Sequence, residues 1–219
     1  MRKPASIAEL TALGRVRLSR NYFMRDMLYS EVGNFCCVPN YPDDPDTAIE
    51  AGRQLCQCIL EPMKAAFGHV AIRSAFRSCR LNAFAHELFK AGDVSAWAAD
   101  NAYNAARHAW DQRDPAGHMG ATATVVIPAY VDYYQQTSDW RSLAWWIRDH
   151  VPAHDEVIFF EQLAAFNIRW YEGAGERKIS FMRPAPFSEE VLTAADLEGF
   201  QGDHSHLYGA AIELLGTGR

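Results

Sequence analysis

Histidine and aspartate side chains gather in one short stretch of the sequence, 107–128, whose second half is an apolar run. His108, Asp111, Asp114 and His118 fall within eleven positions, and the proline and glycine between them predict a loop. Imidazole and carboxylate groups bind zinc and other divalent cations. The four side chains are therefore candidate metal ligands carried by a single loop.

Two other interpretations of this loop stay open. Asp111 and Asp114 can form ion pairs with Arg107 and Arg113, in which case the charges only fix the loop conformation. The same groups can also carry out acid–base chemistry without a metal. The spacing of the residues alone does not separate the three interpretations.

Arg77 is a candidate of another kind, because it follows a predicted buried strand. A guanidinium in that position can hold a substrate carboxylate through paired hydrogen bonds. It can equally cap a helix or pair with an aspartate of the 107–128 stretch. His150 and His154 are expected to have structural roles, whereas His204 and His206 are a further candidate pair that is expected to be solvated at the start of a helix.

The composition excludes several classes of protein. The chain has 219 residues, 49% of them hydrophobic, which is enough for one sizeable core. Its formal charge of −6 argues against broad nucleic-acid binding, which needs a basic surface. No window approaches the roughly 20 apolar residues that cross a bilayer, and the N-terminal residues lack the apolar run of a secretory signal. We therefore expect a cytoplasmic protein with no nucleic-acid or membrane partner.

The cysteines and tryptophans are expected to be structural. An odd number of cysteines without a secretory signal predicts free thiols at Cys36, Cys37, Cys56, Cys58 and Cys79. Cys56 and Cys58 lie two residues apart in a predicted helix, where they point to different faces. Core packing, rather than a ligand platform, is expected for Trp140, Trp145, Trp146 and Trp170.

Hydrophobic periodicity predicts a helix-rich first half and strands concentrated later. Helices are expected over 7–13, 21–32, 46–67, 80–91, 96–106, 130–136, 140–150, 188–199 and 205–215. Strands are expected over 69–78, 121–127, 156–160, 166–171 and 178–182, with the last two joined as a hairpin. This order predicts an α+β fold with a mainly antiparallel sheet packed against N-terminal helices. Residues 1–183 form the predicted domain, and 184–219 a C-terminal helical appendage packed on it.

Two segments resemble one known family. The segment 70–84, VAIRSAFRSCRLNAF, resembles the Ser-Gly-Tyr-Arg-Ser…Asn segment of the D-alanyl-D-alanine carboxypeptidases, with matching positions Ser74, Phe76, Arg77, Ser78 and Asn82. The segment 118–128, HMGATATVVIP, is similar to the family's His-x-x-Gly-x-Ala-x-Asp segment with one residue deleted after His118. The resemblance covers roughly residues 18–183. It implies the Hedgehog/DD-peptidase fold of these zinc enzymes.

The resemblance also implies roles for individual residues. The family's first zinc ligand falls on His118, its aspartate ligand on Thr124 and its last histidine ligand on Lys178. The family's general base falls near Gly175, with Glu172 and Glu176 beside it, and its substrate-binding arginine falls on Arg77. Threonine is a poor ligand and a lysine cation repels zinc, so the usual metal site is not expected in its full form.

Three functional hypotheses follow. In the first, a diverged, peptidase-M15-like pseudoenzyme without the usual zinc site binds a peptide-like ligand or protein partner in the old cleft. In the second, a zinc-type peptidase or amide hydrolase uses a rearranged metal site of His108, Asp111, Asp114 and His118, with Arg77, Glu172 and Glu176 as catalytic candidates. In the third, the chain is a non-enzymatic structural component. The cofactor is zinc in the second hypothesis and none in the others.

Overall fold

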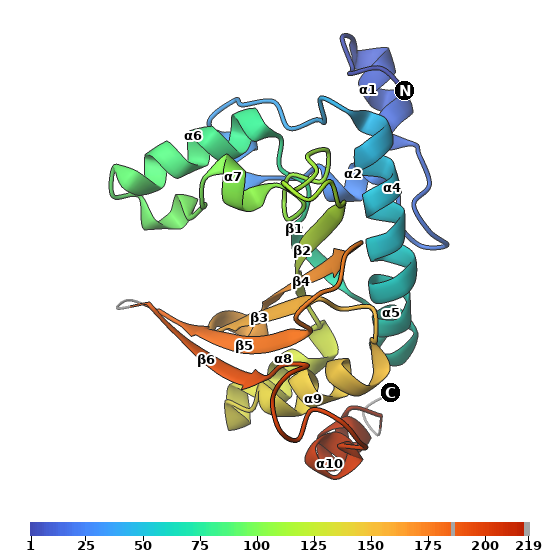
Figure 1. The fold of residues 1–219 in the computed structure, drawn as a ribbon, viewed down its shortest axis with the longest axis vertical. Coiled ribbons are helices and arrows are strands. Elements are labelled where there is room, and N and C mark those ends of the chain that lie inside the picture. Colours follow the sequence, from blue (N-terminus) through green and yellow to red (C-terminus); the bar gives the residue numbers. More distant parts are fainter. Residues whose placement is uncertain (185–186, 217–219) are drawn as a thin grey trace.

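A six-stranded sheet forms the centre of the computed structural model, which describes residues 1–184 and 187–216 (Figure 1). The order of its strands is β1-β2-β4-β3-β5-β6. Neighbouring strands are antiparallel except β3 and β5, which are parallel. Their bounds are β1 (Ala71–Ser74), β2 (Gly120–Val126), β3 (Glu156–Phe160), β4 (Phe166–Tyr171), β5 (Lys178–Arg183) and β6 (Ser188–Thr193). The predicted α+β class with a mainly antiparallel sheet is confirmed.

The hairpin predicted between β4 and β5 is wrong. These two strands do not pair with each other, because β3 lies between them. The connection 172–177 crosses the start of β3, where the backbone N–H of Glu176 donates to Asp155 Oδ1 at 3.0 Å. Gly175 permits this crossing, since a Cβ there would lie 2.0 Å from the same carboxylate oxygen. A glycine that suggested a tight turn therefore marks a close crossing of chain segments.

The two faces of the sheet differ in chemistry. One face is apolar and belongs to the core, and its central residues are Ala121, Ala123, Val125, Val157, Phe159, Phe166, Ile168, Ile179 and Phe181. The opposite face carries Thr122, Thr124, Glu156, Ile158, Asn167, Arg169, Lys178 and Ser180. Side chains alternate between faces along a strand, so this division follows from the sequence of each strand. The mostly polar face is the one available for a binding site.

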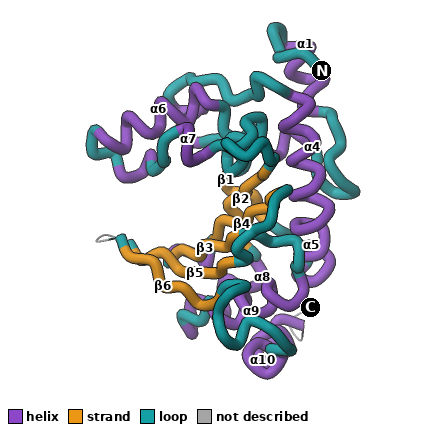
Figure 2. The backbone as a smooth tube through the Cα atoms, in the orientation of Figure 1, coloured by secondary structure: helices purple, strands orange, loops and turns teal. Residues whose placement is uncertain are grey.

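Helices surround this sheet (Figure 2). The segments that flank it are α1 (Ile7–Gly14), α2 (Met24–Met27), α3 (Glu31–Phe35), α4 (Pro45–Leu55), the π-helix η1 (Cys56–Leu60), α5 (Glu61–Phe67), α6 (Cys79–Lys90), the 3-10 turn η2 (Val94–Ala96), α7 (Asn101–Asn104), α8 (Pro128–Thr137), α9 (Arg141–His150), η3 (Gln162–Ala164) and α10 (Ser205–Gly216). The predicted helix 46–67 exists but begins after Asp44, whose side chain accepts from the N–H groups of Asp46 and Thr47. The π-turn lies just before Pro62, where an α-helical ladder would lose a hydrogen bond.

Three predicted helices are wrong, and local capping or pairing explains each difference. The range 21–32 divides into α2 and α3, because Ser30 caps a new helix by accepting from the Gly33 N–H. The range 96–106 divides into η2 and α7, capped by Asp93 and Asp100. The first half of the range 188–199 forms β6, an edge strand of the sheet, and the rest is turns. Residues 185–186 and 217–219 of the predicted appendage lie outside the described residues.

The predicted free thiols and the predicted core packing of the tryptophans are confirmed. All five thiols are free. Trp140 and Trp146 are buried in the core, and Trp145 and Trp170 pack against it. Within the described residues, no helix is both long and apolar enough to cross a bilayer.

The C-terminal helix α10 packs on α9, and one carboxylate organises this contact. Asp149 accepts from Arg148 Nη1 at 2.7 Å and from the His204 N–H at 3.0 Å. The His204 ring lies between Asp149 Oδ1, at 3.0 Å from Nδ1, and the Gly199 carbonyl, at 2.7 Å from Nε2. It also stacks on Trp145. His204 is therefore buried and structural rather than solvated at the start of a helix.

We predict that His204→Ala loosens the C-terminal helix without unfolding the domain. The substitution leaves buried acceptors on Asp149 and Gly199 without their partner, which costs on the order of 1–3 kcal/mol. Hydrogen exchange of the α10 amides should become at least about tenfold faster, while exchange in the sheet stays the same. The exposed neighbour His206 provides the matched control, His206→Ala. Unchanged α10 exchange in His204→Ala would show that this network does not hold the helix.

Candidate functional site

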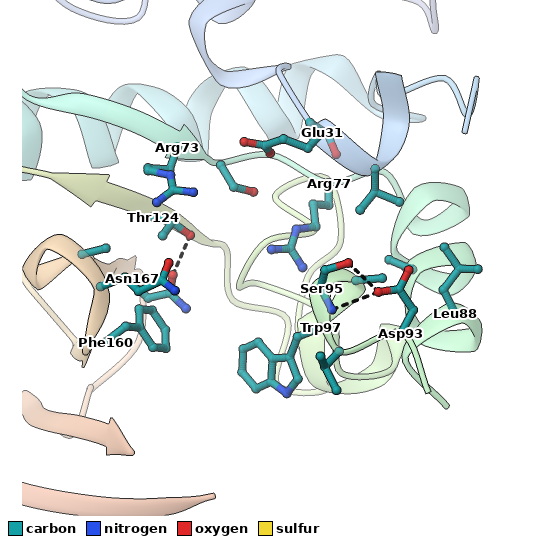
Figure 3. Close-up of a pocket in the computed structure, with 18 of the residues that line it drawn as sticks. Glu31, Arg73, Arg77, Leu88, Asp93, Ser95, Trp97, Thr124, Phe160 and Asn167 are labelled. Carbon is teal, nitrogen blue, oxygen red and sulfur yellow. Dashed lines mark hydrogen bonds between the residues drawn. The ribbon is translucent and has the colours of Figure 1, made fainter. Parts of the chain in front are cut away.

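A cavity of about 940 Å³ opens over the β1–β2–β4 end of the sheet (Figure 3). We call it the cleft. Its floor comes from β1, β2 and β4, one wall from α3, α6 and η2, and the other from the residues that follow β3 and β5. The polar lining residues on which the argument depends are Glu31, Arg73, Ser74, Arg77, Asp93, Ser95, Thr124, Glu161 and Asn167.

The floor presents hydrogen-bond donors. The Thr124 hydroxyl donates to Asn167 Oδ1 at 2.7 Å, across the register in which β2 and β4 pair. This bond occupies the Asn167 carbonyl and leaves the two amide hydrogens facing the cleft without a partner among the described residues. The floor therefore suits a ligand that carries acceptor oxygens.

Arg77 points into the cleft from the turn between β1 and α6 (Figure 3). Backbone bonds fix this turn: the Arg77 N–H donates to the His108 carbonyl at 2.8 Å, and the Phe76 N–H to the Met27 carbonyl at 3.0 Å. The side chain of Asn40 also bonds to the backbone of this turn. Its amide donates to the Phe76 carbonyl at 2.9 Å, and its carbonyl accepts from the Ser78 N–H at 2.8 Å. The guanidinium is thus held by a turn whose polar backbone groups are satisfied.

The charge of Arg77 has no partner in the part of the chain that the structure describes. No described residue forms a hydrogen bond or an ion pair with its guanidinium. Burial lowers the pKa of Arg77 below its ordinary value, and the negative charge of Glu31 partly opposes this shift. A guanidinium stays protonated at neutral pH, so the cleft contains a partly buried cation that is available to an anion.

Apolar side chains line both rims of the cleft. Phe35 is 89% exposed and Val94 73% exposed on one rim, and Phe187 is 57% exposed on the other. Trp97 and Phe160 line opposite sides of the cleft (Figure 3). Exposed apolar side chains concentrated around one cavity indicate a surface that a ligand or partner covers.

The loop 105–118, which contains the candidate metal ligands, forms hydrogen bonds with the backbone next to Arg77. His108 is buried, and its Nδ1 lies 2.8 Å from the Ala75 carbonyl, to which it donates as a neutral ring. Burial, together with the charge of Arg77, lowers the pKa of His108 to about 3. Trp110 is fully buried, contacts the surface of Gly52 and donates from Nε1 to the Thr122 carbonyl at 3.1 Å.

The other predicted metal ligands lie apart from the cleft. Asp111 accepts from the Asp43 N–H at 2.7 Å, and burial raises the pKa of its carboxyl. Asp114 accepts from the His118 N–H at 2.9 Å and from the Tyr171 hydroxyl at 2.5 Å, and this second bond lowers its pKa. The His118 Nδ1 lies 3.1 Å from the same hydroxyl. Asp111 therefore holds the segment before α4, Asp114 and His118 hold the turn before β2, and none of the three lines the cleft.

The described residues do not fit a zinc site. No group of three or more histidine, cysteine, aspartate or glutamate side chains among them is placed to hold a metal ion. The register also changes the expected ligand geometry, because Ser180, not Lys178, lies in line with Thr124 across the sheet. Lys178 instead pairs with Glu189 at 2.9 Å and Glu156 at 3.7 Å.

The two glutamates predicted as catalytic candidates also lie outside the cleft. Glu172 accepts from the Met119 N–H at 2.8 Å and from Arg113 Nη1 at 3.3 Å, so it ties the loop 105–118 to the end of β4. Glu176 is exposed, and its backbone takes part in the crossing over β3. Of the predicted site residues, Arg77 alone lines the cleft.

Two cleft residues were missed from the sequence, Arg73 and Asn167. Asn167 lies between the apolar residues Phe166 and Ile168, and this alternation was a usable signal for a residue on the polar face of the sheet. Arg73 gave no such signal, because its orientation depends on an irregularity in the pairing of β1 with β2.

Comparison of the chain with protein-family models, with curated proteins and with solved structures finds no match. The site must therefore be interpreted from its own geometry.

We predict that Asn40→Ala lowers the free energy of unfolding by roughly 2–4 kcal/mol, because it leaves several backbone groups of the Arg77 turn and the Leu28 carbonyl without their partner. Chemical denaturation measures the loss. Asn34, which is exposed, provides the matched control Asn34→Ala. A stability within about 0.5 kcal/mol of the parent would show that water replaces the Asn40 side chain.

We predict that the fold becomes less stable as the pH drops below about 6.5, in part because of His108. The pKa values of His108 and His154 are lowered to about 3 and about 4, so the unfolded chain takes up protons that the folded chain does not. Above about pH 6.5 the titration of neither ring affects the free energy of unfolding. As the pH drops below that value, each ring lowers the free energy of unfolding by up to about 1.4 kcal/mol per pH unit, until the pKa of the folded state is reached. The amide of His108→Asn can still donate to Ala75 but does not titrate. In this variant, the slope of the free energy of unfolding against pH should be smaller by the contribution of one proton.

The measurement is urea unfolding from pH 7 to pH 4 for the parent and His108→Asn. His154→Asn provides a comparison at the second buried ring, which does not line the cleft. An unchanged slope in His108→Asn would mean that His108 is already protonated in the folded protein.

Proposed function

We propose that this chain binds a peptide-like ligand in the cleft and that Arg77 anchors the ligand's carboxylate. The observation that carries the proposal is the unpaired Arg77 guanidinium, which faces a cavity of about 940 Å³ and has no ionic partner among the described residues. A guanidinium forms two parallel hydrogen bonds with a carboxylate, which gives both orientation and affinity.

The lining of the cleft supports a peptide rather than a bare anion. Donors on the floor suit peptide carbonyl oxygens, and apolar rims suit side chains of a ligand several residues long. The volume lies within the range of ligand pockets, which is about 300–1,000 Å³. An acidic chain with mixed charges around the cleft does not suit the phosphate backbone of nucleic acid.

The same proposal places the chain beside the D-alanyl-D-alanine carboxypeptidases in the Hedgehog/DD-peptidase fold group, as a diverged member. The support is the arrangement in which Arg77 follows a strand and precedes a helix, beside a strand that carries Thr124 at the resembling aspartate position. The zinc ligands of that family do not fit the residues found here, so the proposed function is binding.

We predict that short acetylated peptides bind as free acids at least about tenfold more tightly than as C-terminal amides, because a partly buried guanidinium contributes about 1.5–3 kcal/mol to a carboxylate. Arg77→Gln should remove this difference. Arg80→Gln, which changes an exposed arginine outside the cleft, is the matched control and should keep it. Isothermal titration calorimetry at fixed salt concentration measures both.

Equal affinity for acids and amides in the parent protein would overturn the carboxylate anchor. Metal analysis of protein purified without a chelating tag tests the hydrolase hypothesis separately. About one zinc per chain, lost in His118→Ala, would support a metal hydrolase and overturn binding without catalysis.

A further inference from the structure

A second unpaired cation lies in the cleft beside Arg77. Arg73 lines the cavity from β1, and no described residue forms an ion pair or hydrogen bond with its guanidinium. Figure 3 shows Arg73 near Thr124 and Asn167, with Arg77 between this floor and the wall that carries Ser95 and Trp97. The third arginine of the lining, Arg183, is already paired with Glu190 at 2.6 Å.

An irregularity in β1 directs Arg73 toward the cleft. Ile72 pairs with Val125 and Ser74 pairs with Thr124, so Arg73 is an extra residue between two consecutive partners. A bulge of this kind interrupts the alternation of side chains and re-aims the inserted one. Accordingly, the neighbours Arg73 and Ser74 both line the cavity, which regular strand geometry would not allow.

Among the described residues, no acidic side chain of the lining forms an ion pair with either arginine, although the charge of Glu31 acts on Arg77. Asp93 is engaged by Ser95, which donates to it from its N–H at 3.0 Å and also from its hydroxyl. Glu31 and Glu161 are exposed. A cavity with acids at its edge and free guanidinium groups at its floor disfavours a diffuse polyanion and favours an ordered ligand with fixed carboxylates.

We propose that the ligand is an acidic peptide with two carboxylates, in which Arg77 binds the terminal carboxylate and Arg73 binds an acidic side chain in one of the last two residues. This inference rests on the proposed function and adds the specificity determinant. The two arginines are four positions apart, so their Cα atoms are separated by at most about 14 Å. Two long side chains that start from this separation suit carboxylates one or two residues apart.

The probe is a set of acetylated tetrapeptide pools with random leading positions. One pool ends in glutamate as the free acid, a second ends in glutamine as the free acid, and a third ends in glutamine as the amide. Two more pools place glutamate or glutamine in the penultimate position before a terminal alanine. Retention on the immobilised full-length chain, read by mass spectrometry, gives relative affinities without a guess at the preferred sequence.

The parent protein should retain one of the glutamate pools about three- to tenfold more than its glutamine counterpart, because Arg73 is exposed and its contact is partly screened. Arg73→Gln should reduce this ratio to about one and leave the binding of the glutamine free acids unchanged. Arg77→Gln should reduce the difference between free acid and amide. Arg80→Gln controls for the loss of one positive charge elsewhere.

The failures are distinguishable. Equal retention of glutamate and glutamine pools, or a glutamate preference that survives Arg73→Gln, overturns the role of Arg73 while the carboxylate anchor stands. Equal retention of free acids and amides overturns the anchor and, with it, the inference that depends on it. Circular dichroism of each variant shows that the fold is retained, so a lost preference reports on the cleft.

Discussion

The alternation of side chains in the central sheet is the constraint on which the rest of the structure depends. One face supplies the apolar side chains that α4, α5 and α9 bury, so the opposite face is left to carry polar groups. These polar groups are arranged differently at the two ends of the sheet. At one end of the sheet Arg107, Glu156, Lys178 and Glu189 pair among themselves. At the other end, the guanidinium groups of Arg73 and Arg77 and the amide of Asn167 have no partner among the residues that the structure describes.

The cleft depends on a turn that is fixed from outside it. Asn40 and the loop 105–118 bond to the backbone around Arg77, and the buried Trp110 anchors that loop in the core. Such support holds a charged side chain in a cavity where it would otherwise pair with a carboxylate or move into solvent. His108 belongs to this support as a neutral donor. The histidine that suggested metal chemistry is therefore a positioning residue for the arginine that suggested ligand binding.

A close crossing of chain segments explains why this sheet has a mixed topology. The connection after β4 passes over the start of β3, and Gly175 makes that passage sterically permissible. Consequently β3 lies beside β5, and Ser180 rather than Lys178 aligns with Thr124. The position of β3 between β4 and β5 thus decides which residues lie next to each other on the polar face. The interpretation of the site depends on this arrangement.

The sequence by itself determined the α+β class, the bounds of β3 and β4, the free thiols and the place of Arg77 after a strand, because these follow from periodicity and composition. It could not determine that β3 separates β4 from β5, since strand pairing is a contact between distant segments. Nor could it show that 188–199 begins as an edge strand, because short apolar patterns suit either state until a partner strand is present. The tertiary structure alone decided that His108 and His118 serve different neighbours and that a bulge turns Arg73 into the cleft. Both depend on hydrogen bonds between segments far apart in the chain.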